Sequence, residues 1–102
     1  MHKPNRDFLW LNPQDNVVVA LRPIEKGEVI EVSGNRIHVN ENIMTGHKIA
    51  IRPITIQTMV IKYGEEIGEA TANINIGDHV HVHNVRDITA EIRDKKKEEL
   101  GL

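Results

Sequence analysis

The spacing of one short signature, Ile-x-x-Gly-x-x-Ile/Val, constrains the fold of this chain more than any other feature of its sequence. Its copies are Ile24/Gly27/Ile30, Ile43/Gly46/Ile49, Ile74/Gly77/Val80 and, without the glycine, Ile54/Gln57/Val60. Each copy predicts an apolar anchor, a tight turn and then a strand, because glycine readily adopts the positive φ that many turns need. The copies begin 19, 11 and 20 residues apart, whereas a solenoid repeat has a constant period. We therefore predict two similar, pseudo-symmetric β units that share one core.

The aliphatic composition also predicts a mostly β fold of short strands. The chain holds 14 Ile and 10 Val against 5 Leu, and β-branched side chains pack well on a pleated sheet. Val17–Leu21 predicts a buried strand, and Ser33–Arg36 predicts a hairpin turn between Val29–Val32 and Ile37–Val39. A chain of 102 residues is long enough for one domain with a modest core.

Composition argues against several classes of function. The formal charge is -2, and Phe, Tyr and Trp occur once each, so we expect neither the basic surface nor the aromatic platforms that bind nucleic acids. The absence of cysteine excludes disulfides and thiolate chemistry and fits a reducing compartment. The polar N-terminus predicts no signal peptide, and no apolar run approaches the roughly 20 residues of a membrane span. We therefore expect a cytoplasmic protein that contacts neither nucleic acid nor membrane.

The two ends of the chain differ in character from its middle. Residues 1–7 predict a loose N-terminus, residues 8–85 the β domain, and residues 86–102 a polar helical tail. Asp87 is a suitable N-cap and Gly101 a suitable stop for that C-terminal helix. The thin apolar stripe of the tail leaves two interpretations open: a solvated terminal helix, or a connection to a partner domain.

Three histidines alternate with valine in the segment Asp78–Asn84. On a strand their side chains share one face, and His81 and His83 lie roughly 6.5 Å apart. Two imidazoles at that spacing can converge on a zinc or iron ion, so we predict His81 and His83 as metal ligands. His79 is set apart, since an extended strand would place it roughly 13 Å from His83.

Two ligands do not hold a metal tightly, so a third is expected from His47, from an acid such as Asp78, or from a partner chain. A polar strand edge, or contact with a substrate or partner, remains open for the alternating histidines. His47 and Lys48 follow the turn glycine of the second copy. Together they predict a carboxylate-binding site, because lysine supplies a point charge and histidine a switchable donor; a solvated turn is the alternative.

Two arginines and one loop are further candidates. Arg22 and Arg52 each precede proline, which restricts them to extended backbone. Each can hold a carboxylate through paired hydrogen bonds, although structural salt bridges with the 15 acids of the chain are the simpler interpretation. Tyr63–Gly68 has glycines flanking two acids, which is typical of a mobile loop that closes on a substrate or of an ordinary connection. No Ser-His-Asp order, P-loop or dinucleotide-binding glycine motif occurs.

Four segments carry a family resemblance: Asp15–Arg22, Gly46–Ala50, Val60–Gly68 and His81–Val85. In their order and spacing they resemble the N-terminal domain of the altronate and galactarate dehydratase family, which has the SAF, or β-clip, fold. The resemblance covers roughly residues 8–85, and Thr55–Thr58 departs from it where a glycine-bearing turn is expected. In that family the domain is joined to a much larger catalytic domain, or stands alone, as in the small subunit of (2R)-sulfolactate sulfo-lyase.

The resemblance implies a small subunit of a lyase that eliminates water or sulfite from a hydroxy acid such as altronate, galactarate or sulfolactate. It also implies a divalent metal, with iron favoured. A larger catalytic subunit would supply most of the active site, because elimination needs a base and an acid or metal in one cleft, so we expect the isolated chain to be inactive. The alternative is a non-catalytic binding or assembly module on the same scaffold. A homo-oligomer is also open, since many short strands leave edges to protect.

Overall fold

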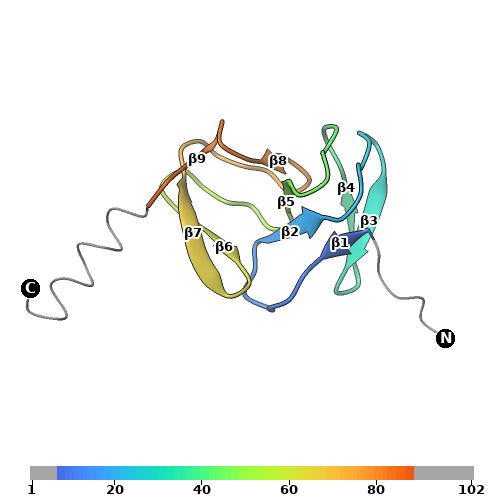
Figure 1. Ribbon diagram of the computed structural model, residues 1–102, viewed down its shortest axis with the longest axis horizontal. Coiled ribbons are helices and arrows are strands. Elements are labelled where there is room, and N and C mark those ends of the chain that lie inside the picture. Colours follow the sequence, from blue (N-terminus) through green and yellow to red (C-terminus); the bar gives the residue numbers. More distant parts are fainter. Residues whose placement is uncertain (1–6, 89–102) are drawn as a thin grey trace, which may run out of the picture.

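In a computed structural model, residues 7–88 are described and form nine short β-strands without a helix among them (Figure 1). The strands are β1 (Phe8–Leu9), β2 (Val17–Ala20), β3 (Val29–Val32), β4 (Asn35–His38), β5 (Lys48–Ala50), β6 (Met59–Lys62), β7 (Glu65–Ala70), β8 (His79–Val80) and β9 (Val85–Arg86). The mostly β fold predicted from the composition is confirmed. Residues 7–88 also hold no helix with the length and apolar character that a membrane crossing requires.

The strands form three antiparallel sheets. The central sheet has the order β1-β2-β5-β8, and the other two are the hairpin β3-β4 and the sheet β6-β7-β9. The hairpin and the three-stranded sheet lie at opposite ends of the domain, with the central sheet between them (Figure 1). The two smaller sheets therefore flank the central one, as expected for two similar β units.

The signature builds the same turn in all its copies. The anchoring isoleucines pair in two isolated bridges, Ile24–Ile43 and Ile54–Ile74. The third residue after each anchor has a positive φ, which is 92° at Gly27, 86° at Gly46, 70° at Gln57 and 90° at Gly77. The copy without glycine thus adopts the same backbone as the others. Each bridge joins two copies of the signature, which is the arrangement expected of two similar units.

The hydrophobic core is divided into two clusters. From β2, Val18 packs with the side chains of the β3-β4 hairpin, whereas Val17 packs with those of β6 and β7. From β5, Ile49 belongs to the first cluster and Ala50 to the second. Neighbouring residues of a strand point to opposite faces, so the central sheet is buried on both of its faces. The prediction of one shared core is wrong for this reason.

Two tight hairpins extend from the signature turns. Ser33 and Gly34 join β3 to β4 with φ values of 49° and 80°, and Tyr63 and Gly64 join β6 to β7 with 56° and 76°. Two successive positive φ values are typical of the turn that matches the twist of a hairpin. The predicted hairpin turn after Val32 is confirmed. For Tyr63–Gly68, where a mobile loop and an ordinary connection were both open, the structure has a hairpin turn followed by β7.

Contacts at both ends of the described region extend beyond the predicted boundaries. Asp7, assigned to the loose N-terminus, accepts a hydrogen bond from Arg22 Nε at 2.8 Å. Its carbonyl oxygen accepts another from the Leu21 N–H at 2.9 Å. Arg86, assigned to the tail, belongs to β9. The helix predicted for the rest of that tail falls on residues that lie almost entirely outside those described.

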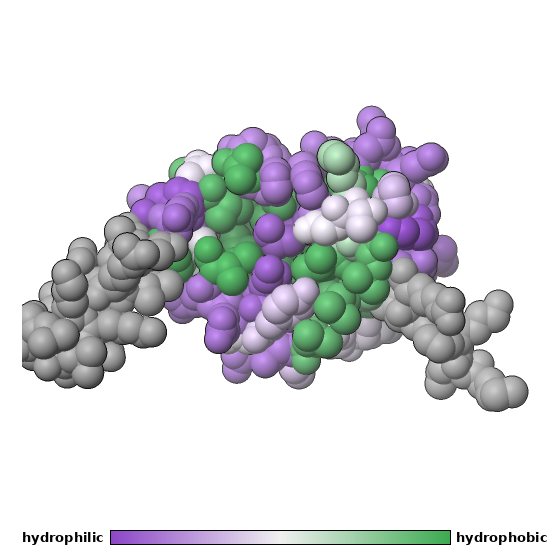
Figure 2. All heavy atoms as spheres, in the orientation of Figure 1, coloured by the Kyte–Doolittle hydropathy of each residue, from purple (hydrophilic) through white to green (hydrophobic). Residues whose placement is uncertain are grey.

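The surface is mainly polar, with apolar side chains in separate patches. Figure 2 shows such patches between polar side chains on one face of the domain. The most exposed large apolar residues are Val82, Met44 and Leu11, with exposed fractions of 81%, 68% and 63%. Single exposed apolar residues are normal in soluble proteins. Exposure alone therefore does not mark a functional residue, and its distance from a candidate site must also be considered.

Candidate functional site

The second and fourth copies of the signature bring two polar segments together in the central sheet. Strand β5 begins at Lys48 directly after Gly46-His47, and β8 begins at His79 after the corresponding turn. The two strands are antiparallel neighbours, with Lys48 opposite Val80 and Ile49 opposite His79. The two segments that are equivalent in the sequence repeat are therefore in direct contact in the fold.

Three imidazoles gather where these segments meet, and we name them the histidine cluster: His47, His79 and His81. His47 Nδ1 lies 2.9 Å from His79 Nε2, and the planes of these two rings differ by 7°. His47 also stacks on His81, with 3.9 Å between ring centroids. One nitrogen from each of the three rings lies within 4.8 Å of the others. Such a spacing places three ligand atoms around a single small volume.

The cluster forms because the chain turns after β8. The strand predicted across Asp78–Asn84 is wrong in its second half, since β8 ends at Val80. The Asn84 Oδ1 accepts a hydrogen bond from the His81 N–H at 2.9 Å, and the Asn84 Nδ2 donates to the His79 carbonyl oxygen at 2.8 Å. These bonds hold the turn closed and carry His81 back toward His79.

The neighbours of His81 therefore differ from those expected on an extended strand. His79, predicted to be set apart, lies within the cluster, and His47 joins it from β5. His83 is exposed, with its ring centroid 5.1 Å from that of His79. Of the two predicted metal ligands, His81 is in the cluster and His83 borders it. Metal binding by either residue remains a prediction.

The surroundings of His79 and His81 favour the neutral form of their imidazoles. Burial lowers the pKa of His79, and nearby His83 and His47 lower it further when they carry charge. Burial also lowers the pKa of His81, as do His47 and Lys48. A neutral ring has one nitrogen that donates and one that accepts, which is what the bond between His47 and His79 requires. The site therefore offers lone pairs for a metal or a proton at neutral pH.

Lys48 lies half-buried beside the cluster without a compensating acid. Burial lowers the pKa of its ammonium group, and repulsion from Lys62 lowers it further. Within residues 7–88 this ammonium group makes no hydrogen bond or ion pair. A partly buried cation is unfavourable unless an anion compensates it. Lys48 thus has the electrostatic character of an anion-binding residue.

An open cavity of about 220 Å³ joins Lys48 to His81. Its wall includes the apolar side chains of Ile67, Val82 and Val85. Arg86 also lines it, but its guanidinium group is paired with Glu69 at 3.1 Å. Asp87 lines the cavity as well. The cavity therefore combines cations, one carboxylate, an imidazole and an apolar wall that includes the strongly exposed Val82.

Asp78, the acid considered as a third metal ligand, serves the turn instead. Its Oδ1 accepts a hydrogen bond from Asn40 Nδ2 at 2.9 Å, and its Oδ2 accepts one from the Asn75 N–H at 2.8 Å. It does not belong to the histidine cluster found among the described residues. Its carboxylate therefore stabilises the turn before β8.

Sequence reasoning missed the role of two residues in the site: Asn84, which closes the turn, and His79, which joins the histidine cluster. Asparagine often ends regular structure by bonding to nearby backbone, so Asn84 directly after the alternating pattern was a usable signal. No local signal marks His79, because its contact with His47 depends on the pairing of β5 with β8.

The fold and the site define a small all-β domain, in which short strands present imidazoles and an ammonium group that has no acid partner among residues 7–88. A sequence profile of the SAF domain of altronate and galactarate dehydratases matches residues 6–88. The chain belongs to this family, as its resemblance predicted.

Its relatives include long and short proteins. Altronate dehydratase of Bacillus subtilis is 42% identical over 88 residues, which cover 86% of this chain and 18% of that protein. Altronate dehydratase of Escherichia coli is 38% identical over 78% of this chain and 16% of that protein. The (2R)-sulfolactate sulfo-lyase subunit alpha of Chromohalobacter salexigens is 36% identical over 78% of this chain and 93% of the relative. The chain thus spans less than a fifth of the altronate dehydratases but nearly all of the sulfo-lyase subunit.

Proposed function

We propose that this chain is a small subunit or accessory domain of a lyase that acts on a hydroxy acid. In this proposal it adds substrate-binding residues to an active site that a larger chain completes. The observation that carries the proposal is the half-buried Lys48, which has no acid partner among residues 7–88 and shares a cavity with His81. A carboxylate is common to altronate and sulfolactate, and a lysine without an acid partner suits it.

The lengths of the relatives support a division of labour. The sulfo-lyase relative is named as subunit alpha and is almost wholly covered by this chain, whereas the altronate dehydratases are more than five times as long as the region that matches. A larger catalytic partner is therefore expected here. The exposed Val82 in the wall of the cavity is well placed to be covered by such a partner.

The residues of the site suggest specific roles. Lys48 would bind the substrate carboxylate, and His47, the residue before it, would hydrogen-bond to the substrate or orient His81 through their stacked rings. His81, which shares the cavity with Lys48, would hold or release a proton near the substrate. Elimination needs both a base and an acid in one cleft, so the remaining groups would come from the larger chain.

We extend the proposal to a divalent metal held by His47, His79 and His81. Neutral imidazole nitrogens bind iron, zinc and related ions, and the three rings bring such atoms within 4.8 Å of one another. The planes of His79 and His81 differ from that of His47 by only 7° and 16°, so the rings must rotate to direct their lone pairs at one point. A bound ion would supply a Lewis acid that polarises a substrate oxygen. Iron is the first ion to test, as the family resemblance implies.

Measuring bound metal in variants distinguishes the ligand set of the histidine cluster from the pair His81 and His83, which was predicted from an extended strand. The purified chain, loaded with Fe²⁺ under anaerobic conditions or with Zn²⁺, is expected to retain about one ion per chain. His47→Ala, His79→Ala and His81→Ala should each lose it, and His83→Ala should keep it. Loss in His83→Ala with retention in His79→Ala would restore the strand-based pair. Absence of metal from the native protein and from its complex would contradict the extension.

Co-purification and kinetics test the lyase proposal itself. A tagged chain recovered from native lysate should retain a larger chain of the dehydratase family, and the pair should eliminate water or sulfite from a hydroxy acid. Lys48→Met should raise KM about tenfold or more without disturbing assembly, because a charge-assisted contact to the carboxylate is lost. Lys26→Met, at an exposed turn, is the matched control. Robust turnover by the isolated chain would contradict the proposal, and hydroxy-acid binding by the pair without turnover would favour a binding module.

A further inference from the structure

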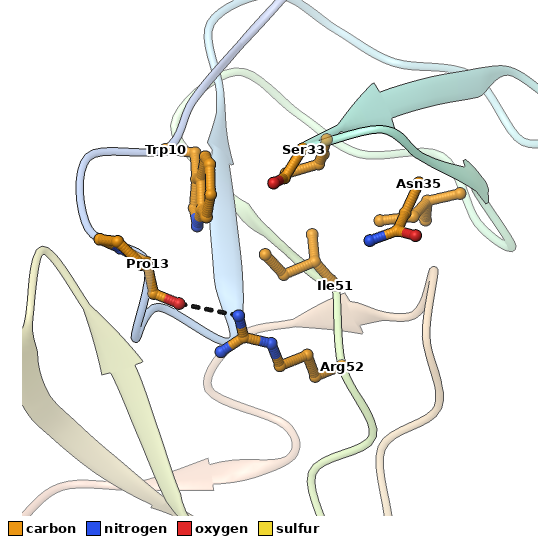
Figure 3. A pocket seen from close by; sticks show the side chains of 8 residues that line it. Trp10, Pro13, Ser33, Asn35, Ile51 and Arg52 are labelled. Carbon is orange, nitrogen blue, oxygen red and sulfur yellow. Dashed lines mark hydrogen bonds between the residues drawn. The ribbon is translucent and has the colours of Figure 1, made fainter.

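A second cavity, of about 190 Å³, lies between the N-terminal segment and the β3-β4 hairpin (Figure 3). None of its lining residues belongs to the histidine cluster or to the Lys48 cavity. Its apolar wall includes the buried Val32 and the partly buried Ile51. Its polar lining includes Trp10, Ser33, Asn35 and Arg52. All four polar residues can donate hydrogen bonds, and no acidic residue lines the cavity.

Trp10 contributes a donor without an acceptor. Its indole Nε1 is buried and has no hydrogen-bond partner within residues 7–88. A buried N–H without an acceptor is unfavourable and uncommon in folded proteins. Figure 3 shows the indole nitrogen at the end of the ring that faces Pro13 and Arg52. The unmet hydrogen bond therefore lies on the side of the cavity where the guanidinium group is.

Arg52 is a cation without an anion. Its Nη2 donates to the Pro13 carbonyl oxygen at 2.7 Å (Figure 3), and no ion pair joins it to an acid within residues 7–88. Arg22, the other arginine before a proline, bonds instead to Asp7 and Glu28 at 2.8 Å each. The structural salt bridge expected for both arginines thus holds for Arg22 alone. Arg52 is an exposed residue that bonds to a neutral carbonyl oxygen, so its other donors are open to solvent or to a ligand.

We propose that this cavity binds the carboxylate of a small organic acid. The carboxylate would accept hydrogen bonds from the Arg52 guanidinium group, whose fork of donors matches two carboxylate oxygens. Because Trp10 Nε1 is buried, the indole ring would have to turn slightly to expose this donor to the bound carboxylate. The short apolar body of the acid would pack against Ile51 and Val32. The cavity has the volume of about six water molecules, which suits an acid of three or four carbons. This site is independent of the proposed lyase function.

The single tryptophan of the chain provides a direct test. The indole N–H of Trp10 gives one resonance in a ¹H–¹⁵N spectrum of the full chain, and propionate and butyrate are titrated at constant ionic strength. We expect a saturable downfield shift of that resonance, and sodium chloride at the same concentration should not reproduce it. Arg52→Gln should weaken binding about tenfold or more, because a charge-assisted bond is removed. Arg36 lies on the β3-β4 hairpin that borders the cavity but does not line the cavity itself. Arg36→Gln is therefore the control and should bind like the original chain.

Further variants keep the test decisive. Arg52→Lys retains the charge but loses the planar fork, so it should bind with intermediate affinity. Trp10→Phe keeps the ring and removes the donor, and its binding is followed by the Ile51 backbone amide. Thermal unfolding shows whether each variant is folded. An absence of saturable shift, or equal affinity in Arg52→Gln and Arg36→Gln, would overturn the proposal. A shift produced only by a glutamate-containing peptide would do so too, since the ligand would then be a protein side chain.

Discussion

The four signature turns have the same backbone, but they lead into two different places in the fold. The first and third lead into the hairpin strands β3 and β6, and the second and fourth lead into β5 and β8 of the central sheet. After the positive-φ residue, the hairpin copies continue with Glu28 and Thr58, and the central copies with His47 and Asp78. The turn fixes the backbone alone, and the pairing of the following strand decides what its side chains can reach.

The hydrogen bonds of the two kinds of turn show the difference. In the first copy, Glu28 bonds to Arg22 close by in the sequence, and in the third, Thr58 bonds to Thr55 in its own turn. In the central copies, His47 bonds to His79 across the β5-β8 pair. The side chains after the hairpin turns thus bond within their own segment, whereas His47 reaches a residue that is far away in the sequence.

The largest expected effect distinguishes the two central turns from each other. A Cβ at Gly77 would lie 2.0 Å from the His38 carbonyl oxygen, whereas a Cβ at Gly46 would meet nothing within 4 Å. Both residues have positive φ. Gly46→Ala should therefore lower the free energy of unfolding by about 1–2 kcal/mol through backbone strain alone. Gly77→Ala should lower it by about 3–5 kcal/mol, because a backbone clash is added. Urea unfolding measures both, and equal losses would contradict the distinction.

A smaller effect is expected at the turn that shapes the histidine cluster. Asn84→Ala removes two side-chain hydrogen bonds from a buried position and should cost about 2 kcal/mol. Asn40→Ala also removes two hydrogen bonds, but from an exposed side chain, so it should cost less. Thermal unfolding compares the two variants. Asn84→Ala should also shift the imidazole resonances of His79 and His81, and unchanged resonances would show that another contact holds the cluster.

Features that depend on residues close together in the sequence could be predicted, whereas features that depend on distant residues could not. The turns and the first hairpin depend on neighbouring residues, so anchors, glycines and β-branched runs predicted them correctly. The alternating histidines suggested a longer strand than β8, because the bonds of Asn84 end it after Val80. The histidine cluster and the burial of β2 on both faces depend on which strands pair, and local sequence patterns do not specify strand pairing. The continuous apolar run Val17–Ala20 did carry a hint, since strands buried on both faces lack alternation.

Substitution of Gln57 tests whether the third turn carries more backbone strain than the three turns that have glycine. It holds a φ of 70° at the position where the other copies have glycine, and a non-glycine residue in this region costs about 1 kcal/mol or more. Gln57→Gly should therefore stabilise the chain by up to about 1 kcal/mol, less the greater entropy that glycine has in the unfolded chain. Gln57→Asn should fall between the two, because asparagine tolerates this conformation better. Destabilisation by Gln57→Gly would mean that the glutamine side chain contributes a contact that offsets the strain.

The smallest expected effect is a pH dependence of stability that belongs to the central turns. The folded chain lowers the pKa of His79 and of His81, so between the folded and unfolded pKa values the unfolded chain binds more protons. Stability is then complete above the unfolded pKa of about 6.5 and falls as the pH decreases through it. The slope should stay well below about 1.4 kcal/mol per pH unit for each ring, because both are partly exposed and screened by solvent. Thermal unfolding with a chelator present, at pH values on both sides of 6.5, measures this slope. His79→Gln and His81→Gln should each flatten it, and a slope that both variants leave unchanged would assign the effect to titratable groups elsewhere in the fold.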